Sequence, residues 1–106
     1  MNRQFIVYLS NKQKHLMTGE LIKGHVSYLG ELKRQGKLPF CGLCKDGTAI
    51  MILKADSQVE AEVLLAGDPF TKANDYQDRR IVGVEEATLE NNFLLDDVLV
   101  NQHNRS

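Results

Sequence analysis

The sequence predicts an α+β domain in which the elements follow one another as strand, helix, strand, strand, helix, strand. Three observations support this prediction. Apolar runs at 5–9 and 48–53 have the length and composition of buried strands. An apolar stripe with helical spacing follows the first run, and a helix-capping motif follows the second. This order is the ferredoxin-like βαββαβ arrangement, with an antiparallel four-stranded sheet.

The first half of the chain contains a strand, a helix and a hairpin. After the apolar run at 5–9, a polar stretch leads into a helix expected at 19–35, which ends at Gly36. A second strand is expected at 38–43, short or irregular because Pro39 cannot donate a backbone hydrogen bond. The Asp-Gly pair that follows favours a hairpin turn into the third strand.

A capping box begins the second helix. The spacing of Ser57 and Glu60 lets each side chain accept a hydrogen bond from the backbone amide of the other. The helix is expected to end at Gly67, before Pro69. Its inward side chains are expected to be Val59, Val63, Leu64 and Ala66. A fourth strand is expected at 76–84.

The composition is that of an ordinary soluble domain. The chain has 106 residues, of which 42% are hydrophobic and 25% charged, so it can bury a core. A formal net charge of -1 gives no attraction to nucleic acid or anionic membranes, and no run approaches the roughly 20 apolar residues of a membrane span. There is no signal-peptide pattern, and two cysteines do not make a disulfide framework. We therefore expect a cytoplasmic protein that binds neither nucleic acid nor membranes.

The C-terminal part is expected to extend beyond the domain. We place the domain at residues 1–87, and a C-terminal helix with a polar tail at 88–106. Two helices cover only one face of the sheet, so the apolar first and third strands leave a second face to be covered. A homodimer through this open face is the simpler explanation, because large apolar patches are rare on monomers. The alternative is that Phe93 and Leu94 fold back over the sheet.

His25 lies in the apolar stripe of the first helix, on the same face as Leu21, Leu29 and Leu32. A titratable ring held there needs a polar partner, because burying an unpaired polar group is costly. Asp68 is the leading candidate, since it follows the second helix, which must pack beside the first. If the two meet, they form an acid/base dyad in a largely apolar pocket.

Each residue of this pair also has a purely structural interpretation. His25 and Asp68 could form a hydrogen bond that only closes a helix–helix contact. An aspartate that follows a helix-ending glycine and precedes Pro69 is often part of a turn and nothing more.

Several other side chains are candidates for the pocket wall. Tyr8, Tyr28 and Phe70 could line it, although Tyr28 and Phe70 are equally consistent with ordinary core aromatics. Arg79 and Arg80 could bind an anionic substrate. Adjacent residues on a strand face opposite ways, so at most one of these arginines reaches a given site.

Cys41 and Cys44 match the C-x-x-C pattern of redox and metal sites. They are expected on or beside a strand, where residues three apart point to opposite faces. Four-coordinate zinc would need two further ligands, and His15 and His103 are remote. We therefore interpret the motif as chance and expect neither a metal nor a cofactor.

RNA-recognition motifs share this element order and stack bases on aromatic residues of their first and third strands. The run at 48–53 has no aromatic residue and the chain is slightly acidic, which argues against RNA binding. A small-molecule-binding or regulatory dimer that uses the same pocket without turnover remains the non-enzymatic alternative.

The chain resembles the YciI-like (YCII-related) proteins over about residues 5–86. The stretch 25–38, with its histidine and helix-ending glycine, is similar to the first helix of that family. The stretch 57–70 is similar to the second helix and to the Asp-Pro-aromatic signature that follows it. The family's Gly-Pro pair appears here as Gly42-Leu43, near the expected pocket wall.

The resemblance implies a dimeric ferredoxin-like α+β barrel with a site centred on a histidine and an aspartate, here His25 and Asp68, with Gly42 in the wall. The family is related to the muconolactone isomerase-like enzymes, and some members remove HCl from chlorinated ring compounds. We therefore expect a cofactor-independent lyase, isomerase or hydrolase acting on a small molecule. His25 would be the general base or acid and Asp68 its orienting partner. The sequence specifies neither the substrate nor the reaction.

Overall fold

The computed structural model describes residues 3–96, which form an α+β domain around one four-stranded antiparallel sheet. The strand order in the sheet is β2-β3-β1-β4, so the predicted ferredoxin-like fold is confirmed. In chain order the elements are β1 (Arg3–Lys12), the 3₁₀ turn η1 (Lys14–Leu16), α1 (Gly19–Arg34), β2 (Phe40–Leu43), β3 (Ala49–Ala55), α2 (Gln58–Ala66), α3 (Pro69–Ala73), β4 (Tyr76–Val84) and the 3₁₀ turn η2 (Asn92–Leu94).

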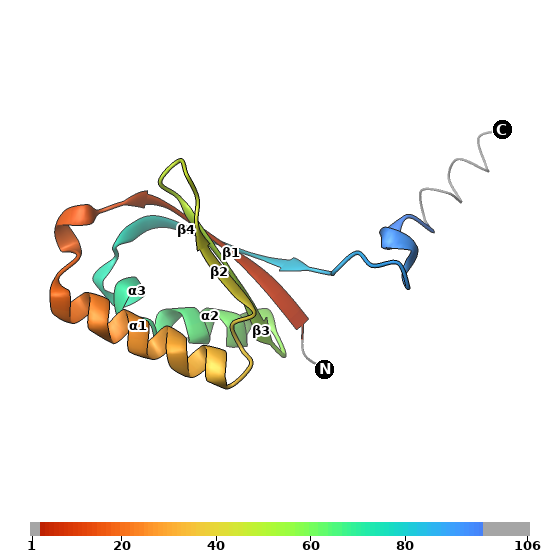
Figure 1. Ribbon diagram of the computed structural model, residues 1–106, viewed down its shortest axis with the longest axis horizontal. Helices are drawn as coiled ribbons and strands as arrows, with labels where there is room; N and C mark the ends of the chain where they lie inside the picture. The colour runs from red at the N-terminus through yellow and green to blue at the C-terminus, as the bar shows by residue number, and fades with distance from the viewer. Residues whose placement is uncertain (1–2, 97–106) are drawn as a thin grey trace.

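The core lies between one face of the sheet and the helices. Figure 1 shows α1, α2 and α3 on the same side of the curved sheet. Alternate residues of the two central strands point toward these helices, because the side chains of a strand alternate between its faces. Val7 on β1 pairs with Met51 on β3, and both are buried. Leu32 of α1 and Leu65 of α2 pack against them.

Local signals set the ends of α1 and of the hairpin. The Thr18 side chain caps α1 by accepting a hydrogen bond from the amide of Leu21, at 3.1 Å. The chain leaves this helix through Gly36, whose φ of 75° is unfavourable for residues with a Cβ. In the hairpin turn, the Asp46 carboxylate accepts hydrogen bonds from the side chain and the amide of Thr48, which lower the pKa of Asp46.

The inward face of α2 differs from the prediction. Ala61 and Leu65 are buried and Leu64 is half-buried, whereas Val59, Val63 and Ala66 are exposed, so three of the four predicted inward residues were wrong. A helix of nine residues with apolar side chains on most sides has no clear stripe, so packing on the sheet decides its rotation.

The predicted capping box of α2 forms with a shift. The Ser57 hydroxyl accepts from the amide of Glu60, at 3.1 Å, as expected. The Glu60 carboxylate accepts from the amide of Asp56 instead of that of Ser57. The cap therefore binds the chain one residue further toward β3.

Helix α3 was not predicted, because its five residues are too few to show a periodic pattern. Asp68 caps it, accepting a hydrogen bond from the amide of Phe70 at 3.0 Å, and Pro69 occupies the first helical position. Gly67, just before the cap, is in close contact with the hydroxyl of Tyr28, where a Cβ would collide. That hydroxyl donates to the carbonyl of Leu64, at 2.7 Å, and so joins α1 to α2.

The second face of the sheet is apolar and is covered by no element within residues 3–96. Its apolar side chains are Ile6, Tyr8, Phe40, Ile50, Ile52 and Val82, and polar side chains such as Lys54 and Arg80 lie nearer its margins. After β4 the chain runs away from the sheet (Figure 1), and Phe93 and Leu94 stay substantially exposed, so they do not fold back over this face.

The C-terminal helix predicted to begin at residue 88 does not begin there. Residues 88–95 form turns that include η2. Asn92, Phe93 and Leu94 have φ values of 54°, 52° and 61°, which a right-handed helix cannot contain. The rest of the predicted helix and the polar tail, residues 97–106, lie outside the described residues. Over residues 3–96, no helix is both long enough and apolar enough to cross a membrane.

Candidate functional site

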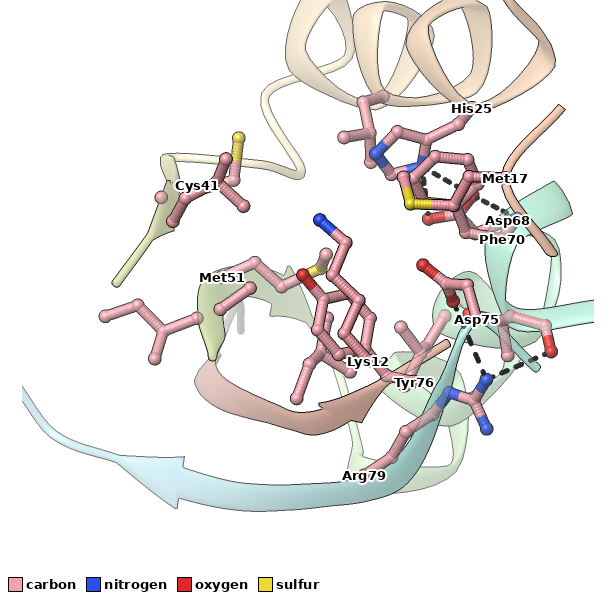
Figure 2. A pocket seen from close by; sticks show the side chains of 18 of the residues that line it. Lys12, Met17, His25, Cys41, Met51, Asp68, Phe70, Asp75, Tyr76 and Arg79 are labelled. Atoms are coloured by element: carbon pink, nitrogen blue, oxygen red, sulfur yellow. Dashed lines mark hydrogen bonds and ion pairs between the residues drawn. The ribbon is translucent and has the colours of Figure 1, made fainter. Parts of the chain in front are cut away.

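A cavity of about 490 Å³ lies on the helix-covered side of the sheet, between the strands and helices α1 and α3. Its wall is mostly apolar and includes Met17, Ile22, Leu29, Met51 and Leu65. Figure 2 shows that a few polar side chains also point into it. This size and lining are typical of sites for small organic molecules.

His25 and Asp68 are in direct contact at the wall of this cavity. The Nδ1 atom of His25 lies 2.8 Å from one carboxylate oxygen of Asp68 and 3.0 Å from the other. The side chains are 19% and 4% exposed, respectively. Because an ionised carboxylate can only accept, it favours the tautomer in which Nδ1 carries the proton. The other ring nitrogen, Nε2, then has a free lone pair, and Figure 2 shows it directed into the cavity.

The helix packing holds both members of the pair. The backbone of α1 approaches α3 closely at Gly24, where a Cβ would stand 3.2 Å from the ring of Pro69. The ring of Phe70 stacks on that of His25 with centroids 3.7 Å apart and planes 3° from parallel. Asp68 caps α3 and binds the imidazole at once, so the structural role and the contact with His25 coexist in one side chain.

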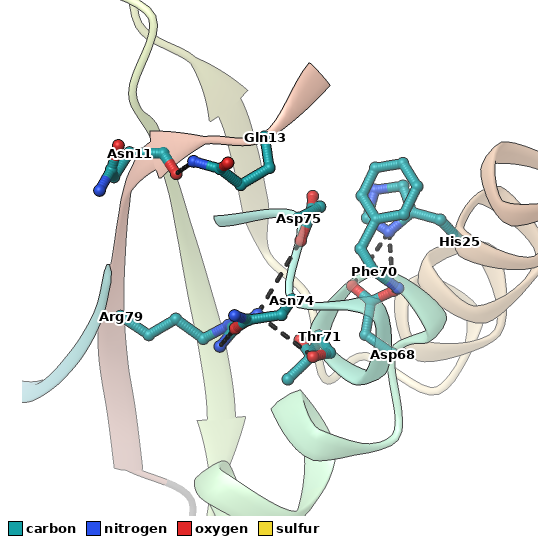
Figure 3. A network of polar contacts seen from close by, with 9 residues as sticks. All are labelled: Asn11, Gln13, His25, Asp68, Phe70, Thr71, Asn74, Asp75 and Arg79. Atoms are coloured by element: carbon teal, nitrogen blue, oxygen red, sulfur yellow. Dashed lines mark hydrogen bonds and ion pairs between the residues drawn. The ribbon is translucent and has the colours of Figure 1, made fainter. Parts of the chain in front are cut away.

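A second polar group lies where α3 meets β4 (Figure 3). The Arg79 guanidinium donates to the side chain of Asn74, at 3.0 Å, and to the carbonyl of Thr71, at 3.2 Å. Its Nη2 lies 4.0 Å from a carboxylate oxygen of Asp75, whose side chain is 2% exposed. Burial raises the pKa of Asp75 above its ordinary value. Lys12, at the end of β1, points its amino group into the same cavity (Figure 2).

The structure places only some of the predicted wall residues at the cavity. Gly42 and Phe70 line it, whereas Tyr8 and Tyr28 do not. Tyr8 lies between Val7 and Leu9, so strand alternation turns it to the open face of the sheet. Tyr28 points between α1 and α2, where it is a structural residue. Burial, followed by the negative charge of Asp68, raises the pKa of the Tyr28 phenol.

The two arginines on β4 separate as expected. Arg79 lines the cavity, and Arg80 lies over the ring of Tyr8 on the open face, at 5.8 Å from the ring centroid. Lys12 and Asp75 were not predicted as cavity residues, because the sequence places both in polar segments expected to be loops. No sequence signal marks them, because polar loop residues are usually solvated.

The two cysteines are free thiols. Cys41 lies at the cavity wall, and Cys44 follows the end of β2. Over residues 3–96, no group of three or more His, Cys, Asp or Glu side chains is arranged to hold a metal ion.

Comparisons with known proteins show the family and the fold. The sequence matches the family model of the YCII-related domain over residues 4–85. Among solved structures, it is similar to 5-chloro-2-hydroxyhydroquinone dehydrochlorinase from Burkholderia phenoliruptrix AC1100, in complex with 2,5-dihydroxybenzoquinone. The TM-score is 0.64 and the sequence identity is 22%. The match covers 78% of this chain and 94% of the other chain, and it shows a likeness in fold. No curated protein sequence matches the chain.

Proposed function

Because the chain belongs to the YCII-related domain family, we propose that it is a cofactor-independent enzyme that acts on a small, largely apolar organic molecule in the cavity beside His25. The supporting observation is the 2.8 Å contact between His25 Nδ1 and the Asp68 carboxylate. It keeps the proton on Nδ1 and leaves Nε2 as a base at an apolar wall. An orienting carboxylate behind a histidine is the arrangement that general acid–base catalysis uses.

In the proposed reaction, Nε2 of His25 takes a proton from a C–H or O–H group of the substrate. The electron pair of the broken bond forms a new double bond. In an elimination it expels a leaving group such as chloride; in an isomerisation the proton returns to another carbon. Asp68 stabilises the imidazolium that forms in between. The similar structure is that of a dehydrochlorinase with a hydroxylated ring compound bound, which favours the elimination of HCl from a chlorinated ring compound as the first reaction to test.

The test is a panel of chlorinated and hydroxylated ring compounds, followed by chloride release for turnover and by NMR titration for binding. His25→Gln removes the base, and the matched control His15→Gln changes an exposed histidine of η1. We expect turnover by the wild-type protein and by the His15 variant, and a loss of at least about 100-fold in the His25 variant with binding retained. Equal turnover by all three proteins would contradict the role of His25.

Binding without turnover by the wild-type protein would instead support the non-catalytic alternative, a ligand-binding or regulatory protein that uses the same cavity. No binding of any compound would contradict a small-molecule site of this class.

We also propose that the protein is a homodimer through the open face of the sheet. The apolar side chains on that face have no cover within residues 3–96, and patches of this kind mark protein interfaces. Ile52→Lys places a charge in the middle of the face. Val63→Lys, at an exposed position of α2, is the control. Light scattering should show that the wild-type protein and the Val63 variant are dimers and that the Ile52 variant is a monomer. A wild-type monomer at micromolar concentration would refute the proposed dimer.

The proposed location is the cytoplasm. It is supported by the free thiols of Cys41 and Cys44, which a reducing compartment maintains. Fractionation of cells that produce the full-length protein tests this, and recovery from a secreted or membrane fraction would contradict it.

A further inference from the structure

Asp75 is fixed at the wall of the cavity by its backbone. Asn74, which ends α3, has a left-handed conformation with φ 60° and ψ 41°, and this turns the chain back toward the sheet. The amide of Asp75 then donates to the carbonyl of Phe70, and its carbonyl accepts from the amide of Gln13. With both backbone groups bound, the residue is held 1% exposed at the cavity that His25 also lines.

One oxygen of the Asp75 carboxyl group is not satisfied by the described part of the protein. Within residues 3–96, its buried Oδ2 atom has no hydrogen-bond partner. The guanidinium of Arg79 is 4.0 Å away from the other oxygen, beyond a hydrogen bond, and it donates instead to Asn74 and Thr71. Leaving a buried polar atom unpaired is unfavourable, so such atoms in folded proteins call for an explanation. Packing does not explain this one, because an apolar side chain would fill the same wall without the penalty.

Charges from several elements act on this carboxyl group. Burial raises the pKa of Asp75 most, and the negative charge of Asp68 raises it further. The backbone amide of Tyr76, the charge of Arg79 and that of His25 lower it. Lys12 of β1 lines the same cavity. His25, Asp68 and Asp75 all line this one cavity, so one small molecule bound in it can contact both sites.

We propose that Asp75 is a ligand-binding residue whose Oδ2 forms a hydrogen bond with a hydroxyl group of the molecule that reacts at His25. This inference rests on the proposed function and specifies its substrate class: a ring compound with at least one hydroxyl group away from the reacting position. A hydroxyl both donates and accepts, so it pairs with either protonation state of the carboxyl group. An ammonium group pairs well only with the ionised form, and a carboxylate only with the protonated one.

The probes are three dihydroxybenzenes (catechol, resorcinol and hydroquinone) and the three methylphenols that match them. Each pair differs by one hydroxyl replaced by a methyl group of similar size. Dissociation constants are measured by NMR titration without oxygen. Because the added hydroxyl pairs a buried acceptor that otherwise has no partner, we expect at least one dihydroxybenzene to bind about tenfold more tightly than its methylphenol partner.

Asp75→Leu removes the acceptor and should bring this ratio to about one. Asp75→Asn keeps an oxygen and should keep part of the ratio. Asp78→Asn, at an exposed position of β4, is the matched control and should keep all of it. A wild-type protein without preference for any dihydroxybenzene, or a preference that survives in the Asp75→Leu variant, would overturn the proposal.

The proposed function and the proposed role of Asp75 can be refuted independently of each other. If the dihydroxybenzene preference depends on Asp75 but no compound is turned over, Asp75 binds ligand in a protein that is not an enzyme. If turnover depends on His25 but Asp75→Leu changes neither affinity nor KM, the enzyme stands and the role of Asp75 is refuted.

Discussion

The substitution Asp68→Asn tests the dyad by reversing the imidazole tautomer with little change in shape. The new amide keeps one oxygen to accept from the amide of Phe70, so α3 keeps its cap. The other oxygen, 3.0 Å from His25 Nδ1, becomes an NH₂ group, which can only donate. The oxygen that remains lies 2.8 Å from Nδ1 and already accepts from the amide of Phe70, so we expect the new NH₂ group to donate to Nδ1 and the proton to move to Nε2, the nitrogen that faces the cavity. The base is lost although every side chain remains in place.

The expected magnitudes follow from this exchange. A hydrogen bond to a charged group, about 1.5–3 kcal/mol, is replaced by a neutral one, about 0.5–1.5 kcal/mol, so the free energy of unfolding should fall by roughly 1 kcal/mol. For a domain of this size that lowers Tm by about 4–8 °C. A reversed tautomer in a serine protease triad lowers kcat by about 10⁴-fold, and we expect a loss of about 10³-fold or more in any turnover found here.

The assay is the ¹⁵N chemical shift of the two ring nitrogens of His25, which identifies the protonated one directly. It is read near neutral pH in the wild-type protein, in Asp68→Asn and in the control Asp78→Asn. The wild-type and control proteins should show a protonated Nδ1, and Asp68→Asn a protonated Nε2. A protonated Nδ1 in all three proteins would refute this expectation, since the oxygen that remains in the Asp68→Asn variant would then be enough to keep the proton on Nδ1.

Three further changes test the packing and the buried charge. Gly67→Ala places a methyl group against the Tyr28 hydroxyl and should lower the free energy of unfolding, measured in urea, by about 1–3 kcal/mol. Gly30→Ala, with open space around it, should raise that free energy by up to about 1 kcal/mol. Equal effects of the two substitutions would contradict the close contact at Gly67. Because the pKa of Asp75 is raised on folding, its proton stabilises the fold below the unfolded value of 3.8, and this stabilisation is lost as the pH rises through the folded pKa. Asp75→Asn should therefore raise Tm relative to wild type more at neutral pH than in acid, and a difference independent of pH would contradict the shift. Ser57→Ala removes the cap of α2 and should lower the free energy of unfolding by about 1 kcal/mol, so an unchanged urea midpoint would show that the cap does not contribute.

Most of the fold could be predicted because it depends on signals within a few residues. Gly36 ends α1 close to the predicted position, the Asp46-Gly47 turn forms the hairpin, and β4 spans the predicted residues. The backbone at these points has few alternatives, since a glycine, a turn pair or an alternating run restricts it locally. The rotation of α2 had no such signal. The start of α3 had one, the Asp68-Pro69 pair, but it was interpreted as a turn, so both features were missed.

The sequence by itself determined the order of the elements and the fold class. It made a contact between His25 and Asp68 a hypothesis, because two consecutive helices pack on one sheet face, and the structure supplied the contact itself. Only the tertiary structure decided what else reaches the cavity. Lys12, Asp75 and Arg79 come from the end of β1, from the junction of α3 with β4 and from β4 itself. Whether such a side chain is solvated or buried depends on contacts between segments far apart in the chain. For Asp75 the distant contact is the backbone hydrogen bond from the amide of Gln13 to its carbonyl, which no local pattern encodes.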